Sequence, residues 1–348
     1  MTNALPAPAS EADEPIEQLY AERQIRGKHE LLHTLRELRR KLVAHAAIAE
    51  AAKRARLPLS PRDFILSFIA LFGAAACQPW AIQRAPWLVP GLLFLQLVGM
   101  AGFNSLAHES WHKMAFPGKL ANRILSEWVI APLLLRNLDR PREDHILHHK
   151  LPGEPEDPSS GVWAQKPEEF RRSMVSRVLV VPAAIDVLRG MLTGQRAHTN
   201  WKGDDHKLRG AEIARIALLH GGWLLYLAWA SAAVLWTIPI AWAVAWAMPM
   251  ALGSAAAHLR EYAEHARSAD GRTIVYDTLC PTWQRWLIPG GFFNYHALHH
   301  VFPEVPQRNL PRLYAEIART VDMQQDYYGF SSQVGLQRSY LRLLRSAR

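Results

Sequence analysis

Apolar and polar residues are strongly segregated along this chain of 348 residues. Apolar runs without Asp, Glu, Lys or Arg, each about as long as a bilayer-crossing helix of roughly 20 residues, alternate with long polar segments. The runs are Phe64–Ile82, Trp87–Ala107, Ile216–Trp236 and Ile238–Ala257. Very short links separate the first run from the second and the third from the fourth. The pattern therefore predicts two transmembrane helical hairpins rather than buried helices of a soluble protein.

Basic residues indicate how these hairpins are oriented. Apart from Arg84, the hairpin tips lack Lys and Arg, which crowd the segments outside the hairpins. The positive-inside rule then places both termini and the middle segment in the cytoplasm. We expect five parts: a tail and basic helix over 1–60, a hairpin over 61–107, a cytoplasmic segment over 108–212, a second hairpin over 213–257 and a cytoplasmic segment over 258–348.

The N-terminal part contains one predicted amphipathic helix, Glu17–Arg56. Its apolar side is formed by Ile25, Leu31, Leu32, Leu35, Leu38 and Leu42. Such a basic amphipathic helix lies on an anionic lipid leaflet or packs on a cytoplasmic domain, and the sequence does not separate these two arrangements.

Clustered histidines are the main chemical signal. They form an HxxxH motif at His108 and His112, an HxxHH motif at His145, His148 and His149, and a second HxxHH motif at His296, His299 and His300, with His265 nearby. Spacings of three and four residues place imidazoles on one helix face. A single zinc site needs about four ligands, so these histidines predict more than one metal ion. The predicted topology places all of them on the cytoplasmic side, near the membrane surface.

Several details of this site stay open at the sequence level. Asp144 or Asp157 accepts a hydrogen bond from the second ring nitrogen of a ligating imidazole, or both are solvated, and the sequence does not separate these arrangements. His258 and Glu261 fall near the same helical face as His265. His258 is a metal ligand or is buried at the membrane interface, and Glu261 is a weaker candidate ligand.

Composition narrows the classes of function. Only Cys77 and Cys280 are present, which gives neither a disulfide framework nor a cysteine set for an iron–sulfur cluster. No nucleic-acid-binding motif, flavin motif or secretory leader is evident. The net charge of +9 suits a lipid surface or an acidic protein partner. The high content of Ala and Arg is typical of bacteria with GC-rich genomes, so we expect a multi-pass protein of a bacterial inner membrane.

Two interpretations compete with a multi-metal enzyme. His108-Glu109-x-x-His112 matches the zinc-protease pattern, in which both histidines bind zinc and Glu109 is the general base. An intramembrane zinc protease would leave both HxxHH motifs unexplained. A non-catalytic membrane protein that handles metal ions is the other interpretation. It also needs fewer histidines than the chain supplies.

The stretch from Asn294 to Pro311, NYHALHHVFPEVPQRNLP, closely resembles the most specific signature of the membrane fatty-acid desaturase and hydroxylase superfamily. The order and spacing of the histidine motifs, and their positions relative to the hairpins, extend the resemblance over about Phe64 to Leu313. Arg260–His265 resembles the family's R-x-x-x-E-H element. By position, the resemblance implies the metal ligands His108, His112, His145, His148, His149, His265, His296, His299 and His300.

The resemblance implies an all-α integral membrane protein with four transmembrane helices in two hairpins. A cytoplasmic helical domain would hold a non-haem di-iron centre that uses O₂ to oxidise an unactivated C–H bond of an apolar, lipid-like substrate. We favour desaturation of a fatty acyl chain, with hydroxylation of an alkyl, acyl or other apolar substrate as the alternative. Electrons would come from a separate donor: a ferredoxin, a rubredoxin or a haem protein with its reductase.

Overall fold

The computed structural model describes residues 30–57, 61–130, 132, 139–160, 166–178, 210–230, 240–241, 243–267, 273–281 and 293–338. Most of these residues are helical. The longer helices are α2 (Glu30–Val43), α3 (Ala46–Ala55), α4 (Pro61–Phe68), α5 (Ala74–Arg84), α6 (Val89–Trp111), α7 (Lys119–Ile124), α9 (Asp139–Lys150), α11 (Pro167–Val178), α13 (Gly210–Ala230), α15 (Met248–Glu264), α17 (His296–Val301) and α18 (Leu310–Thr320). Short 3-10 or π-helical turns continue or connect them: η2 (Ile69–Gly73), η3 (Pro86–Leu88), η4 (Leu125–Ile130), η5 (Ala243–Ala247), η6 (Phe293–Tyr295), η7 (Gln307–Asn309) and η8 (Met323–Tyr327).

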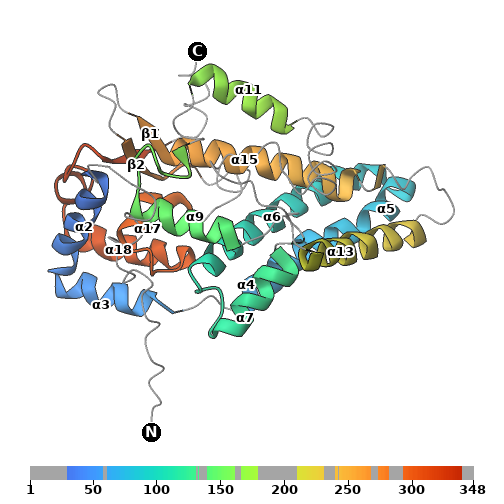
Figure 1. The fold of residues 1–348 in the computed structure, drawn as a ribbon, viewed down its shortest axis with the longest axis horizontal. Coiled ribbons are helices and arrows are strands. Elements are labelled where there is room, and N and C mark those ends of the chain that lie inside the picture. The colour runs from blue at the N-terminus through green and yellow to red at the C-terminus, as the bar shows by residue number, and fades with distance from the viewer. Residues whose placement is uncertain are drawn as a thin grey trace, which may run out of the picture.

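The apolar helices gather at one end of the molecule, where α5 and α13 lie (Figure 1). Within the described residues, three helical stretches are long and apolar enough to cross a membrane: Phe64–Arg84, Pro86–Trp111 and Ile213–Ala230. The first two lie against each other, because α4, η2 and α5 all pack along α6. The start of the predicted fourth run lies outside the described residues and its remainder is helical in η5 and α15, so the four-span topology stays a prediction.

The first two apolar helices are closely packed because two glycines of α6 face the helix formed by α4 and η2. A Cβ atom built on Gly99 would collide with the backbone nitrogen of Leu71, and one on Gly102 would collide with the side chain of Ser67. Small residues permit this close approach of membrane helices. Two buried glutamines strengthen the packing: Gln78 Nε2 donates to Gln96 Oε1 at 2.8 Å, and Gln96 Nε2 donates to the Ala245 carbonyl at 2.6 Å.

A small sheet was not predicted. It consists of β1 (His265–Arg267), β2 (Thr273–Thr278) and β3 (Val334–Gln337) in the order β1-β2-β3. β1 pairs antiparallel with β2, and β2 pairs parallel with β3. The expectation of an all-helical protein therefore holds for most of the described chain, but not here. The sheet directs the chain out of α15 at His265, which pairs with Val275.

The N-terminal amphipathic helix is broken in two. Described from Glu30, it ends at Val43 as α2 and resumes as α3 at Ala46, which corrects the single helix we predicted. Its leucines 31, 35, 38 and 42 are buried in a core that also contains α17 and α18. The apolar side thus packs on the protein, and only the packed arrangement agrees with this burial. α2, α3, α17 and α18 together form the end of the molecule opposite α5 and α13 (Figure 1).

Candidate metal centre

The predicted histidines lie on four separate segments that meet beyond the apolar helices. His108 is in the last turn of α6, and His112 follows as its C-cap. The second motif occupies the last two turns of α9, and the third begins α17. His265 is the residue at which α15 ends and β1 begins, so it extends from a strand rather than from the helical face that we predicted.

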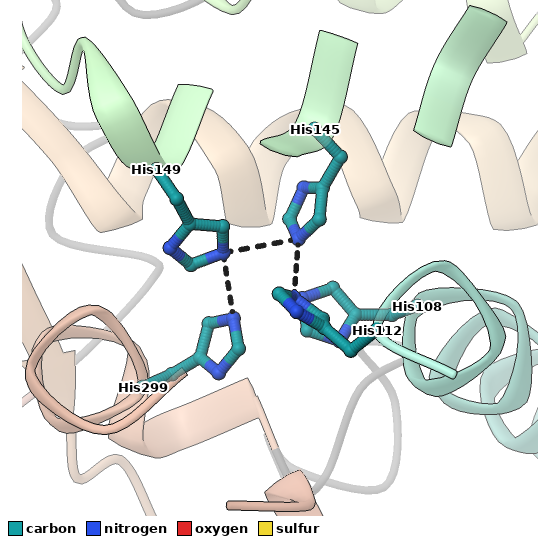
Figure 2. Close-up of side chains that lie close together, drawn as sticks. All are labelled: His108, His112, His145, His149 and His299. Carbon is teal, nitrogen blue, oxygen red and sulfur yellow. Dashed lines mark hydrogen bonds between the residues drawn. The ribbon is translucent and has the colours of Figure 1, made fainter. Parts of the chain in front are cut away.

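The first group contains five histidines: His108, His112, His145, His149 and His299. Figure 2 shows their rings converging from α6, α9 and α17. The Nε2 atoms of His112 and His145 are 2.9 Å apart, those of His145 and His149 are 3.1 Å apart, and those of His149 and His299 are 3.0 Å apart. The ring of His108 lies 4.5 Å, between centroids, from the rings of both His145 and His299.

The second group contains four buried histidines: His148, His265, His296 and His300. Its Nε2 atoms are as close as those of the first group. The distance from His296 to His265 is 2.7 Å and that from His300 to His296 is 3.1 Å. The groups adjoin one another, because the rings of His149 and His300 are only 4.5 Å apart between centroids.

These nitrogen–nitrogen distances fit metal coordination. Two imidazole nitrogens bound about 2.1 Å from one metal ion, at right angles to each other, lie about 3.0 Å apart. In each group, candidate ligand atoms all lie within 4.8 Å of one another. Each group therefore offers enough converging nitrogens for one ion.

Each HxxHH motif is divided between the groups. On α9, His145 and His149 belong to the first group and His148 to the second. On α17 the pattern is reversed, since His296 and His300 belong to the second group and His299 to the first. On one face of a helix, the residue four positions on is displaced by about 40° around the axis in one direction, and the residue three positions on by about 60° in the other. Two helices thus supply both groups.

Burial keeps most of these imidazoles neutral. For His112, burial and the charge of Arg142 lower the pKa to about 3. Burial, followed by repulsion from neighbouring histidines, also lowers the pKa well below its usual value for His145, His149, His265, His296, His299 and His300. A neutral ring binds a metal ion without first losing a proton. The site is therefore suited to bind metal at neutral pH.

His148 is held by a carboxylate. Its Nδ1 lies 2.9 and 3.0 Å from the two carboxylate oxygens of the fully buried Asp157. Burial lowers the pKa of His148, but the Asp157 carboxylate outweighs it and raises this pKa. Donation from Nδ1 to Asp157 leaves Nε2 facing the second group. Of the two aspartates considered from sequence, the structure pairs Asp157 with a clustered histidine.

The loop after α9 holds Asp157 in place. The backbone N–H groups of Gly153 and Ser159 donate to its carboxylate at 3.2 and 2.8 Å. Gly153 has φ of 81°, a conformation that favours glycine. A Cβ on Gly153 would also lie 2.7 Å from Cβ of Thr273. This loop therefore supplies the carboxylate that orients His148.

Two further carboxylates near the second group were missed from sequence. Glu264 is buried with Oε2 3.4 Å from His296 Nδ1 and Oε1 3.4 Å from Arg260 Nε. Burial raises the pKa of Glu264 to about 8. Asp277, on β2, accepts a hydrogen bond from the backbone N–H of Leu298, inside the third motif. For Glu264, its position directly before His265 was the available signal; for Asp277, nothing local pointed to the site.

Glu109 and His258 lie outside both groups. Glu109 Oε1 accepts a hydrogen bond from the backbone N–H of Gln307 at 2.8 Å, and the side chain is fully buried. Glu109 therefore links the first motif to the loop that follows the third. His258 stacks on Phe170 with centroids 5.2 Å apart. Glu261 also lies outside both groups of the described residues.

The family comparison agrees with this site. A search of curated proteins and a search of solved structures each found no match to the chain. The model of the family "Fatty acid desaturase", in contrast, matches residues 84–332, a segment that contains all nine clustered histidines. This match covers well over half of the 348 residues, and the same segment contains two of the apolar helices, Pro86–Trp111 and Ile213–Ala230. The chain belongs to the fatty acid desaturase family.

Proposed function

We propose that the nine clustered histidines bind two iron ions, one in each group. The convergence of imidazole nitrogens in two adjoining groups is the observation that carries this proposal. Imidazole binds several transition metals, so the choice of iron rests on the family. When bound, the iron pair would supply the activation of O₂ that removes hydrogen from an unactivated C–H bond.

The proposed reaction is desaturation of a fatty acyl chain. One –CH₂–CH₂– unit loses two hydrogens and becomes –CH=CH–, while O₂, two electrons and two protons, together with those two hydrogens, become two waters. Hydroxylation by the same site is the alternative, in which one oxygen atom enters the C–H bond and the other becomes water. Both outcomes need two electrons from an external donor.

The protein's own part is to hold the ligands and keep the site dry. α9 and α17 fix His148, His149, His299 and His300 relative to one another, and Asp157 holds the ring of His148 in one orientation. His108 and His112 stand at the end of the apolar stretch Pro86–Trp111, so we expect the site near the membrane surface. An acyl chain could thus reach it while the polar head stays near water.

We place the site and both termini in the cytoplasm, because Lys and Arg, apart from Arg84, avoid the predicted hairpin tips. The high content of Ala and Arg supports a bacterial inner membrane. The donor is a ferredoxin, a rubredoxin or a haem protein with its reductase. A net charge of +9 favours an acidic donor. Reduction rates that rise as salt falls support electrostatic docking, and rates independent of salt contradict it.

The first experiment measures metal and products. Protein purified in detergent from iron-supplemented cells should contain about two irons per chain. Lipids of expressing cells should gain double bonds; new hydroxyl groups instead would support the hydroxylase. A single zinc with peptide cleavage would support the protease reading of His108-Glu109-x-x-His112. Metal without O₂ uptake under reducing conditions would support a metal-handling protein.

Histidine variants test the ligand set. His148→Ala and His299→Ala each remove one nitrogen from a different group and should abolish turnover while membrane insertion is retained. His258→Ala is a matched control, since His258 is equally buried but lies outside both groups. Normal turnover in either ligand variant would remove that residue from the set.

A further inference from the structure

A short helical rod after the first histidine motif has an apolar face on its outside. The rod consists of α7 and η4, Lys119–Ile130. Leu120 is 71% exposed, Ile124 49% and Trp128 52%. These three residues are four apart and so lie along one side of the rod. A helix that faces water normally carries polar residues on its exposed side. This apolar face therefore indicates contact with an apolar environment.

The opposite side of the rod is fixed to the protein. Leu125 and Ile130 are buried in the core around α6. The Asn122 side chain closes the turn before the rod, accepting from Phe116 N–H at 3.1 Å and donating to the carbonyls of Phe116 and Gly118. The apolar side is therefore held outward by packing and hydrogen bonds, and does not result from a loosely attached helix.

The rod connects the ends of two membrane-spanning helices. In the turn just before the rod, Phe116 packs edge-on against Phe64, the first residue of the Phe64–Arg84 span, with centroids 5.9 Å apart. At the other end, Arg215, near the start of the Ile213–Ala230 span, lies 4.8 Å from the ring of Trp128. The rod thus runs between the bases of two spans.

Charges border this apolar face. Lys119 and Arg123 are exposed on the rod. The acidic Glu127 is neutralised twice, since its carboxylate lies 2.6 Å from Arg123 Nε and 3.1 Å from an Arg215 nitrogen. The border is consequently basic, which is complementary to anionic phosphate headgroups.

We propose that Lys119–Ile130 lies in the bilayer surface on the side of the histidine groups. Leu120, Ile124 and Trp128 enter the boundary of the acyl chains, and Lys119 and Arg123 contact the phosphates of anionic lipids. Tryptophan and basic residues are typical of such interfacial helices. The rod begins soon after His112, so its docking would set the depth of the first histidine motif. The proposal concerns membrane placement and does not depend on the reaction.

The test measures depth with a nitroxide label. Leu120→Cys and Ile124→Cys are made in a Cys77→Ala/Cys280→Ala background and placed in nanodiscs that contain phosphatidylglycerol. Collision rates are compared for O₂, which partitions into lipid, and a water-soluble nickel chelate. Leu225→Cys, in the third span and 74% exposed, is the lipid reference, and Val43→Cys on α2, 37% exposed, is the aqueous reference.

The expected result is that both rod labels resemble the Leu225 label, with high O₂ and low nickel access. Labels that behave like the Val43 label would overturn the proposal. Nanodiscs of phosphatidylcholine alone test the contribution of the anionic headgroups. Access of the nickel chelate to the Leu120 label should rise when anionic lipid is removed. Equal access in both lipids would overturn the headgroup contact. The label reads depth without turnover, so failure of the proposed reaction would not affect this result.

Discussion

Removal of the Asp277 carboxylate should loosen the helix that supplies both histidine groups. Asp277 is fully buried on β2, and its Oδ1 accepts the Leu298 N–H at 3.1 Å. Its Oδ2 accepts the Tyr327 hydroxyl at 3.0 Å. Leu298 is in the first turn of α17, where backbone N–H groups have no partner within the helix. Tyr295, the N-cap residue, supplies no side-chain hydrogen bond, so a carboxylate from another segment caps this helix.

The expected loss of stability follows from the hydrogen-bond donors that Asp277→Ala leaves buried without an acceptor. The Leu298 N–H and the Tyr327 hydroxyl each lose their acceptor, at about 1–3 kcal/mol per group. The free energy of unfolding should fall by about 2–6 kcal/mol. Asp277→Asn keeps an acceptor oxygen and nearly the same volume. Burial raises the pKa of Asp277 to about 7, so a neutral side chain is tolerated and Asp277→Asn should lose about 2 kcal/mol or less.

Two measurements on detergent-purified protein check this reasoning: the melting temperature, and iron per chain at a temperature where circular dichroism shows the variant folded. Asp277→Ala should lower both values, and Asp277→Asn should recover most of the iron. Asp326→Ala, at an exposed aspartate, is the control and should match the parent. A parental melting temperature together with parental iron content in Asp277→Ala would refute the capping role.

Other contacts give further expectations. Asp157→Asn should weaken iron binding about 10–100-fold in competition with a chelator, because the orienting partner of His148 is lost. Glu109→Gln should retain oxidation, since an amide oxygen still accepts the Gln307 N–H; abolished oxidation would indicate a role for Glu109 beyond this contact. Gly153→Ala should lower the melting temperature by an amount equivalent to about 1–3 kcal/mol, because alanine is strained at φ of 81°; an unchanged value would contradict that strain.

The histidines could be predicted from sequence because their spacing is local. At about 100° per residue, His145 and His149 lie about 40° apart on α9, and His148 lies about 60° to the other side. Helical geometry alone therefore predicts that the histidines of each HxxHH motif point in two directions. Which direction meets which partner depends on how α6, α9 and α17 pack, and that information is not local.

The contacts that hold the histidines were the unpredictable part. Glu109 and Gln307 are 198 positions apart in the sequence. Asp277 contacts Leu298 only because β2 packs beside α17. The strands of the sheet are too short to give a periodic signal. The break between α2 and α3 was also missed, because the basic and apolar pattern of Glu30–Ala55 continues across Ala44 and His45.

The separation between the two groups is set by backbones rather than by flexible side chains, because α9 and α17 each contribute to both. This gives two distinct ways to damage the site. His299→Ala removes one nitrogen from the first group and leaves α17 capped, so the second group should keep its metal. Asp277→Ala leaves all nine histidines but frees the start of α17, so both groups should lose metal together. Titration of each variant with iron should therefore give one tight and one weakened site for His299→Ala, and two weakened sites for Asp277→Ala. One tight site in both variants would mean that the groups are positioned independently, against the shared-helix argument.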